Sequence, residues 1–220
     1  MIRAGTKSEV VWGRGNWIIL DIGFSNDKKT CGFVFGDGSP MNLCYADARR
    51  TIIEQIRKQK GPINLIIEAP LSVCFDANHN PKGRTFEKRD SKTRYWYTGL
   101  GCAVMTAAMY LIRDIHEAMK DLPNVEIRLF EGFVSFKEGK TDDKKDVRAL
   151  REKIKNAQQF QGSIYSADEL KFDESDELFS AFRVASLDCG IPAVIVAWPI
   201  PEDRHQSSSI QSQPSLSRRM

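Results

Sequence analysis

Four carboxylates occupy positions where the neighbouring sequence is apolar. Asp21 and Glu68 each end an apolar run, whereas Asp173 and Asp176 precede an apolar segment. A buried carboxylate is costly to desolvate unless it is paired or binds a metal ion. Carboxylates that converge repel each other unless cations lie between them, and a set of oxygen ligands suits Mg²⁺ or Mn²⁺. The sequence therefore predicts a divalent-metal site formed by these side chains.

Each of these acids also has an ordinary explanation. Asp173 could cap a helix, with Asp176 favoured in the first turn by the helix dipole. Glu68 could pair with a lysine or an arginine, and Asp21 could be a turn residue. The combination of a strand-end aspartate, a strand-end glutamate and an Asp-x-x-Asp spacing is harder to explain residue by residue. The combination favours one shared site.

Apolar runs and helical periodicities alternate along the chain. We expect strands at 16–23, 30–35, 41–44, 63–67, 125–130 and 193–198, and helices at 46–60, 95–120, 142–160 and 175–189. The strands lack the alternation of a sheet with one solvent face, so both faces should be covered. A hairpin or meander followed by alternating helices and strands predicts a mixed α/β sheet. Asp21 and Glu68 would then lie at the carboxyl ends of parallel strands, where such sheets bind ligands.

Three further segments bear on the site. Asp173 and Asp176 would open the helix at 175–189 and share one face, because they are three residues apart. The helix at 142–160 is dominated by charge, and we expect an exposed helical insertion over 140–160. Periodicity disappears between 71 and 93, which predicts a long basic loop, and loops of that length are usually functional or disordered.

Composition limits the remaining possibilities. A chain of 220 residues suits one domain, which we place at 1–200, before a Ser/Gln-rich tail at 201–220 that we expect to be disordered. The net charge of +3 is too small to indicate a nucleic-acid partner by itself. Scattered cysteines and distant histidines predict free thiols and no zinc site. No apolar run reaches the roughly twenty residues that span a bilayer, so we expect a cytoplasmic protein without a membrane partner.

Segments around the acids resemble the RNase H-like superfamily. More narrowly, the chain resembles the family of predicted RNase H-like nucleases classed as a domain of unknown function. The resemblance rests on Trp17–Gly23, Leu65–Leu71, Leu129–Phe136 and Asp173–Phe182, and the last is similar to the Asp-x-x-Asp-Ala-Leu helix of Holliday-junction resolvases. It implies an RNase H-like mixed sheet with helices on both faces, and a nuclease activity.

The resemblance also implies roles for the acids. Asp21 would be the first-strand aspartate that bridges two metal ions, and Glu68 would be the second acidic ligand. Asp176, assisted by Asp173, would complete the site from the last helix. Two Mg²⁺ or Mn²⁺ ions about 4 Å apart would clamp a phosphodiester, one activating the attacking water and the other stabilising the leaving 3′ oxygen.

Two further acids and two segments complete this interpretation. Glu131 matches a strand-end acid of the family that would shape the pocket. Glu177 stands where the family commonly has alanine, which makes it a possible pocket residue. The charged helix at 142–160 and the long loop at 71–93 are departures from the minimal fold.

The segment at 82–97 mixes cations with aromatic side chains. Basic groups meet phosphates, and aromatic faces can stack on unpaired bases. The residues expected to bind nucleic acid, either DNA or RNA, are Arg84, Lys88, Arg89, Lys92, Arg94 and Trp96. The alternative is a solvated loop whose aromatic side chains pack on the core.

These features favour a divalent-metal-dependent nuclease. A catalytically inactive binding or scaffold protein on the same fold is the first alternative, because one fold can host many functions. The second is half of an actin-like ATPase, since Asp21–Gly23 followed by Ser25 and Lys28 is faintly similar to a phosphate loop. Metal titration and nucleotide-dependent stabilisation would separate the three. The oligomeric state is left open.

Overall fold

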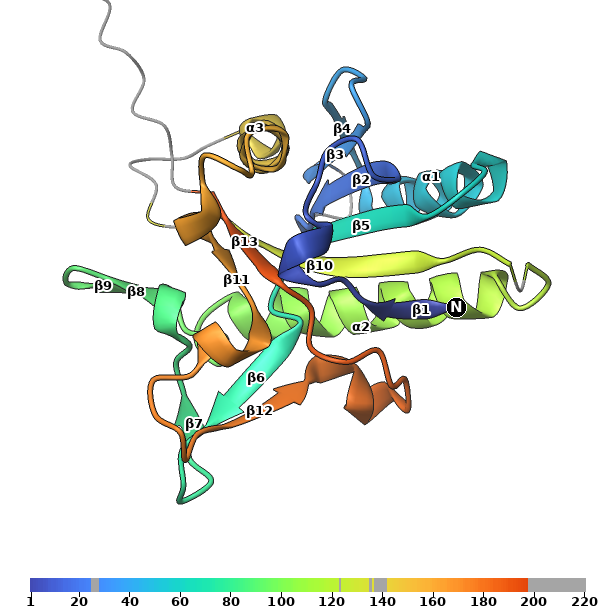
Figure 1. Ribbon diagram of the computed structural model, residues 1–220. Coiled ribbons are helices and arrows are strands. Elements are labelled where there is room, and N and C mark those ends of the chain that lie inside the picture. Colours follow the sequence, from blue (N-terminus) through green and yellow to red (C-terminus); the bar gives the residue numbers. More distant parts are fainter. Residues whose placement is uncertain (25–27, 123, 135, 137–141, 198–220) are drawn as a thin grey trace, which may run out of the picture.

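A computed structural model describes residues 1–24, 28–122, 124–134, 136 and 142–197 of the chain (Figure 1). The expected tail at 201–220 and Ser25 of the possible phosphate loop lie outside these residues. The central sheet contains β1 (Ile2–Ala4), β2 (Asn16–Asp21), β3 (Cys31–Phe35), β4 (Met41–Leu43), β5 (Ile63–Glu68), β10 (Ile127–Phe133), β11 (Ile164–Tyr165) and β13 (Val194–Val196). The α-helices are α1 (Tyr45–Lys58), α2 (Gly101–Ala118) and α3 (Asp143–Lys155) in the described part of the chain.

The strand order of the central sheet is β11-β13-β10-β5-β2-β3-β4, with β1 beside β10. The strands β2, β5, β10 and β13 run parallel, whereas β3, β4 and β11 are antiparallel to their neighbours. The consecutive strands β2, β3 and β4 form a meander, and α1, α2 and α3 precede β5, β10 and β11 respectively. This mixed α/β architecture is consistent with an RNase H-like fold and confirms the predicted fold class.

Helices cover both faces of the sheet (Figure 1). Because side chains alternate along a strand, successive residues of β2 belong to different cores. Ile18 and Leu20 pack in the core formed with α1 and α2. Trp17 and Ile19 pack in the core formed with α3. The expectation of a sheet covered on both sides is therefore confirmed.

The helix α3 differs from the predicted exposed insertion. Val147, Leu150 and Ile154 are fully buried and form one apolar stripe at helical spacing. This stripe packs on Val34 and Ile66 in the second core. Charged residues dominate the sequence of α3, so the three apolar residues are not conspicuous in it. The prediction of an exposed insertion is wrong.

The segment at 71–93 also differs from the predicted loop. It contains β6 (Ser72–Phe75), β7 (Pro81–Lys82) and a hairpin of β8 (Lys88–Arg89) with β9 (Lys92–Thr93). The expected helix at 175–189 is instead β12 (Glu177–Ser180), followed by a 3₁₀ turn (Ala181–Ala185). β12 pairs antiparallel with β6, which satisfies backbone groups that a helix would otherwise pair within itself. The Ser180 hydroxyl accepts the Phe182 N–H and favours the bend into the turn.

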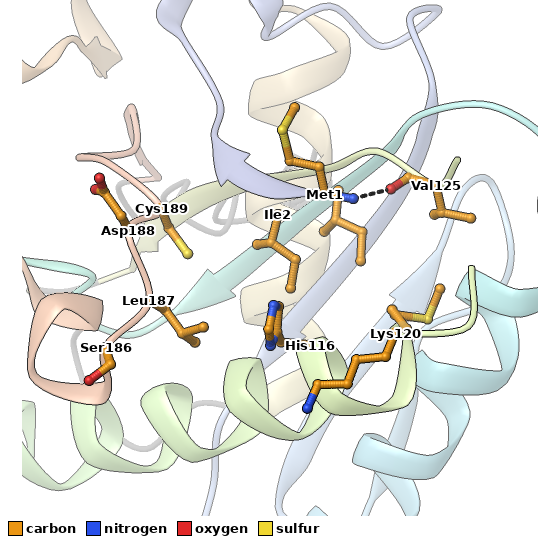
Figure 2. A pocket seen from close by; sticks show the side chains of 11 residues that line it. Met1, Ile2, His116, Lys120, Val125, Ser186, Leu187, Asp188 and Cys189 are labelled. Atoms are coloured by element: carbon orange, nitrogen blue, oxygen red, sulfur yellow. Dashed lines mark hydrogen bonds between the residues drawn. The ribbon is translucent and has the colours of Figure 1, made fainter. Parts of the chain in front are cut away.

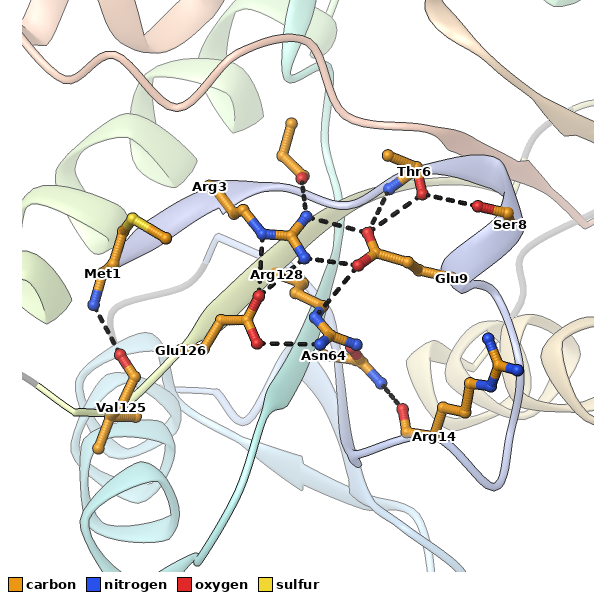
Figure 3. A network of polar contacts seen from close by, with 11 residues as sticks. Met1, Arg3, Thr6, Ser8, Glu9, Arg14, Asn64, Val125, Glu126 and Arg128 are labelled. Carbon is orange, nitrogen blue, oxygen red and sulfur yellow. Dashed lines mark hydrogen bonds and ion pairs between the residues drawn. The ribbon is translucent and has the colours of Figure 1, made fainter.

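A network of ion pairs fastens β1 to the adjacent strand β10 (Figure 3). Arg3 Nε donates to Glu126 Oε1 at 2.9 Å, and the two Nη atoms of Arg3 donate to the two carboxylate oxygens of Glu9. Arg128 donates to Glu126 Oε2 at 2.9 Å. The hydrogen bond from Arg3 is the main reason why the pKa of Glu9 is lowered to about 2. The network is charge-balanced, and it explains why the amino-terminal strand joins the sheet.

Candidate metal centre

Two of the predicted acids lie side by side at the carboxyl ends of parallel strands. Asp21 is the last residue of β2 and lies in register with Glu68, the last residue of β5. Both residues continue the rows of Trp17, Ile19 and Ile66, whose side chains face α3. The parallel arrangement inferred from the two apolar runs therefore brings these carboxylates to one point on the α3 face.

The helix α3 adds a third carboxylate to this pair. Asp146 lies in the first turn of α3, and its carboxylate joins those of Asp21 and Glu68 so that one oxygen of each lies within 4.8 Å of the others. Asp21 and Asp146 are only 7% and 5% exposed, and Glu68 is half-buried. The amino-terminal end of a helix favours negative charge, which suits an acid at this position.

Two glycines explain how α3 comes so close to the sheet. Gly32 lies in register with Asp21 on β3, and Gly132 lies in register with Glu68 on β10. A Cβ at position 32 would overlap the carbonyl oxygen of Asp143, and a Cβ at position 132 would lie 2.8 Å from Leu150 Cδ1. The four residues form one row across the sheet, with the two carboxylates in the middle and a glycine at either side. This row is where the amino-terminal half of α3 rests.

The donor set of the cluster fits a metal ion. Three carboxylates offer oxygens only, which is the ligand type that hard divalent cations prefer. The site is shielded by α3 on one side and is ordered by backbone contacts, such as the 3.3 Å hydrogen bond from Val134 N–H to Glu68 Oε1. A buried acidic cluster of this kind can hold a divalent ion. A bound ion would stabilise it, because carboxylates this close together repel each other.

The other two predicted ligands are not part of this cluster. Asp173 and Asp176 lie in the turn before β12, and Lys82 Nζ bridges them at 2.6 Å and 2.8 Å. Asp176 also accepts the backbone N–H groups of Phe172 and Asp173. The helix on which their predicted role depended is absent at 175–189, so both acids shape a turn of the smaller sheet instead.

Asp146 is the candidate ligand that sequence reasoning missed. The signal was present, since Asp143 and Asp146 have the same Asp-x-x-Asp spacing and are followed by the buried stripe of Val147 and Leu150. The charged composition of 142–160 led to the prediction of an exposed helix instead.

The two expected pocket acids have different surroundings. Glu131 is fully buried on β10, where its Oε2 accepts from Arg84 Nη1 at 2.8 Å and from Leu71 N–H at 2.7 Å. Burial raises the pKa of Glu131 although the Arg84 ion pair opposes this shift. Glu177 is exposed on β12, with its carboxylate 3.9 Å from His79. The cluster of Asp21, Glu68 and Asp146 contains neither of them.

The residues expected to contact nucleic acid fall into two groups. Arg84 is fully buried, and Trp96 is 8% exposed with its indole N–H donating to the Lys82 carbonyl at 2.9 Å. Neither can meet a substrate at the surface, so the structure does not support a substrate contact by Arg84 or Trp96. The other four cations are exposed on or beside the β8–β9 hairpin: Lys88, Arg89, Lys92 and Arg94.

A cavity of about 320 Å³ lies at the opposite end of the sheet (Figure 2). It is lined by residues from the amino end of β10, such as Ile127, together with His116, Asp188 and Cys189. The metal cluster is therefore separate from this cavity. Among the described residues, no helix is both long and apolar enough to cross a membrane.

Comparisons with protein families, with curated proteins and with solved structures found no match to this chain. The mixed sheet and the cluster of Asp21, Glu68 and Asp146 are compatible with an RNase H-like fold. The functional argument therefore rests on the geometry of this cluster.

Proposed function

We propose that the protein is a divalent-metal-dependent nuclease of RNase H-like type that hydrolyses phosphodiester bonds in DNA or RNA. The observation that carries the proposal is the meeting of Asp21, Glu68 and Asp146 at the carboxyl ends of β2 and β5. Carboxylates from two central strands and a covering helix can hold Mg²⁺ or Mn²⁺ ions at a place where α/β sheets bind ligands.

The chemistry divides between the ions and the chain. Bound ions would polarise the phosphodiester and lower the pKa of an attacking water, so no nucleophilic side chain is required. Asp21, Glu68 and Asp146 would hold the ions, and the row of residues across the sheet would keep these carboxylates in place. Asp21 lies between Gly32 and Glu68 in that row and faces α3, which makes it the central ligand.

A paired substitution tests the proposal. Asp146→Asn should weaken Mn²⁺ binding at least tenfold and slow cleavage of labelled DNA or RNA about 100-fold or more, since metal ions supply several kcal/mol of transition-state stabilisation. Asp188→Asn, which neutralises an exposed aspartate beside the cavity at the other end of the sheet, is the matched control and should change neither quantity. Calorimetric Mn²⁺ titration and single-turnover cleavage are the measurements.

Two outcomes would contradict the proposal. Wild-type cleavage by Asp146→Asn would show that the cluster is not the reactive centre. Mn²⁺ binding without cleavage of DNA or RNA would favour the binding or scaffold protein, which shares this fold but lacks catalysis.

A further inference from the structure

The β8–β9 hairpin concentrates positive charge at the surface. Residues 88–94 contain four cations and one acid, and all of them are exposed. Arg89 lies opposite Lys92 across the hairpin, and like charges directly opposite each other disfavour an isolated hairpin. Four exposed cations on one hairpin offer a polyanion several points of contact.

The hairpin is held firmly at its base. Arg94 N–H donates to the Glu87 carbonyl at 2.8 Å, which closes the two ends of the hairpin. The Glu87 side chain is fully buried and accepts from both the backbone N–H and the Nη2 of Arg84, each at 2.8 Å. Both ends of the hairpin are therefore tied to one buried arginine.

The same arginine connects the hairpin to the strands of the metal centre. Arg84 Nη1 lies 2.8 Å from Glu131 Oε2 on β10, and the next residue, Gly132, lies in register with Glu68. Glu131 also accepts the N–H of Leu71, three residues after Glu68. In Figure 1 the hairpin lies at the left of the view, the side towards which β5 and β10 run. Buried ion pairs are costly, and fixing a conformation is one known use of them.

We propose that the β8–β9 hairpin is a fixed arm that binds the phosphodiester backbone of a nucleic acid whose scissile bond lies at the metal centre. This inference rests on the proposed nuclease function. Cations arranged along an extended ribbon fit a chain of phosphates better than a single small anion, which needs donors that converge. Because the buried ion pairs of Arg84 with Glu87 and Glu131 hold the hairpin in place, little conformational entropy of the hairpin is lost on binding.

The test compares two variants that each remove four positive charges. The hairpin variant is Lys88→Gln, Arg89→Gln, Lys92→Gln and Arg94→Gln. The control variant is Arg50→Gln, Arg57→Gln, Lys58→Gln and Lys60→Gln, whose cations are exposed on α1 and on the turn before the amino end of β5. Equal changes in net charge separate a local contact from a general electrostatic effect.

Binding of a fluorescent single-stranded oligonucleotide is measured in EDTA over a range of salt concentrations, so that no cleavage occurs. Each lost phosphate contact should lower the log–log salt slope by about 0.7, and the hairpin variant should therefore lose about 2 to 3. The control should keep the wild-type slope. An unchanged slope in the hairpin variant would overturn the proposal, as would a wild-type protein that binds anionic vesicles but no oligonucleotide.

A separate Mn²⁺ titration distinguishes this inference from the function on which it rests. The hairpin variant should bind Mn²⁺ as tightly as the wild type, because its four cations lie outside the carboxylate cluster. If the wild-type protein fails to bind Mn²⁺, yet the hairpin variant shows the expected fall in slope, the nuclease is overturned and the hairpin remains a nucleic-acid contact.

Discussion

Two groups of acids are built around the adjacent strands β5 and β10, and their surroundings differ. Glu68 on β5 points to the α3 face, where it meets Asp21 and Asp146. Glu131 on β10 is one residue away from the position opposite Glu68, and its carboxylate meets the guanidinium of Arg84. Each group contains buried carboxylates: Asp21 and Asp146 in the first, and Glu131 in the second. The comparison teaches that the neighbours in space, and not burial, decide whether such an acid gathers with other carboxylates, as a metal site requires, or faces a buried arginine.

The two groups should also respond differently to the loss of a partner. In the ion-paired group, Glu131 and Glu87 share Arg84, and all three side chains are fully buried. Removing Arg84 would leave the carboxylates of Glu87 and Glu131 buried without the positive charge that Arg84 supplies. In the metal cluster, a bound cation can supply the compensating charge, so loss of one ligand should affect metal binding more than folding.

The largest expected effect breaks the ion-paired group. Arg84→Met should lower the free energy of unfolding by about 3–5 kcal/mol, because it leaves uncompensated buried charge. Arg94→Met, in the same segment but exposed, should change it by less than about 0.5 kcal/mol. Urea unfolding at neutral pH measures both. If the two variants were equally stable, the buried ion pairs would not hold this part of the fold.

The second prediction sharpens the comparison on the metal side. Gly32→Ala should weaken Mn²⁺ binding about tenfold or more, because its Cβ would meet the backbone of Asp143 and displace the start of α3. Gly132→Ala is the matched variant at the other end of the row. Its Cβ would meet only the end of the Leu150 side chain, which can rotate, so the loss should be smaller.

Calorimetric titration measures the Mn²⁺ affinity of both glycine variants, and urea unfolding confirms that each is folded. Equal affinities in wild type and Gly32→Ala would show that the approach of α3 does not set the geometry of the cluster.

The comparison also explains what could be predicted from the sequence. Asp21 and Glu68 were found because a buried parallel strand is a local pattern, an apolar run that ends in an acid. Asp146 was missed because the apolar stripe of α3 is diluted by charge. The burial of Arg84 could not be predicted, since its partner Glu131 is 47 residues away and no local pattern separates a buried arginine from an exposed one.

The smaller sheet was missed for a related reason. β12 pairs with β6, so that Leu178 lies opposite Cys74, more than a hundred residues away in the chain. Asp173 and Asp176 precede a segment whose composition allows a helix, and only this distant pairing makes it a strand. Tertiary contacts decide the secondary structure of a segment whose own propensity for helix or strand is weak.

The smallest expected effect concerns the acids that sequence reasoning misplaced. Asp173→Asn should change the free energy of unfolding by less than about 1 kcal/mol, because its carboxylate is 65% exposed and its ion pair with Lys82 is screened by solvent. Asp176→Asn should cost more, about 1–3 kcal/mol, because this carboxylate is buried and accepts two backbone N–H groups. Neither variant should alter Mn²⁺ binding, since both acids lie outside the cluster.

The pH dependence of Asp176→Asn provides a check on the cause. Burial alone would raise the pKa of Asp176, but the hydrogen bonds from Lys82 and from the two backbone N–H groups hold it below its usual value. A lowered folded pKa means that this carboxylate stabilises the fold above the unfolded pKa, about 3.9, and ceases to do so as the pH falls through the folded value. The difference in stability between wild type and Asp176→Asn should therefore be full at pH 7 and shrink below pH 4. A difference in Mn²⁺ affinity at pH 7 would instead return Asp176 to the metal centre.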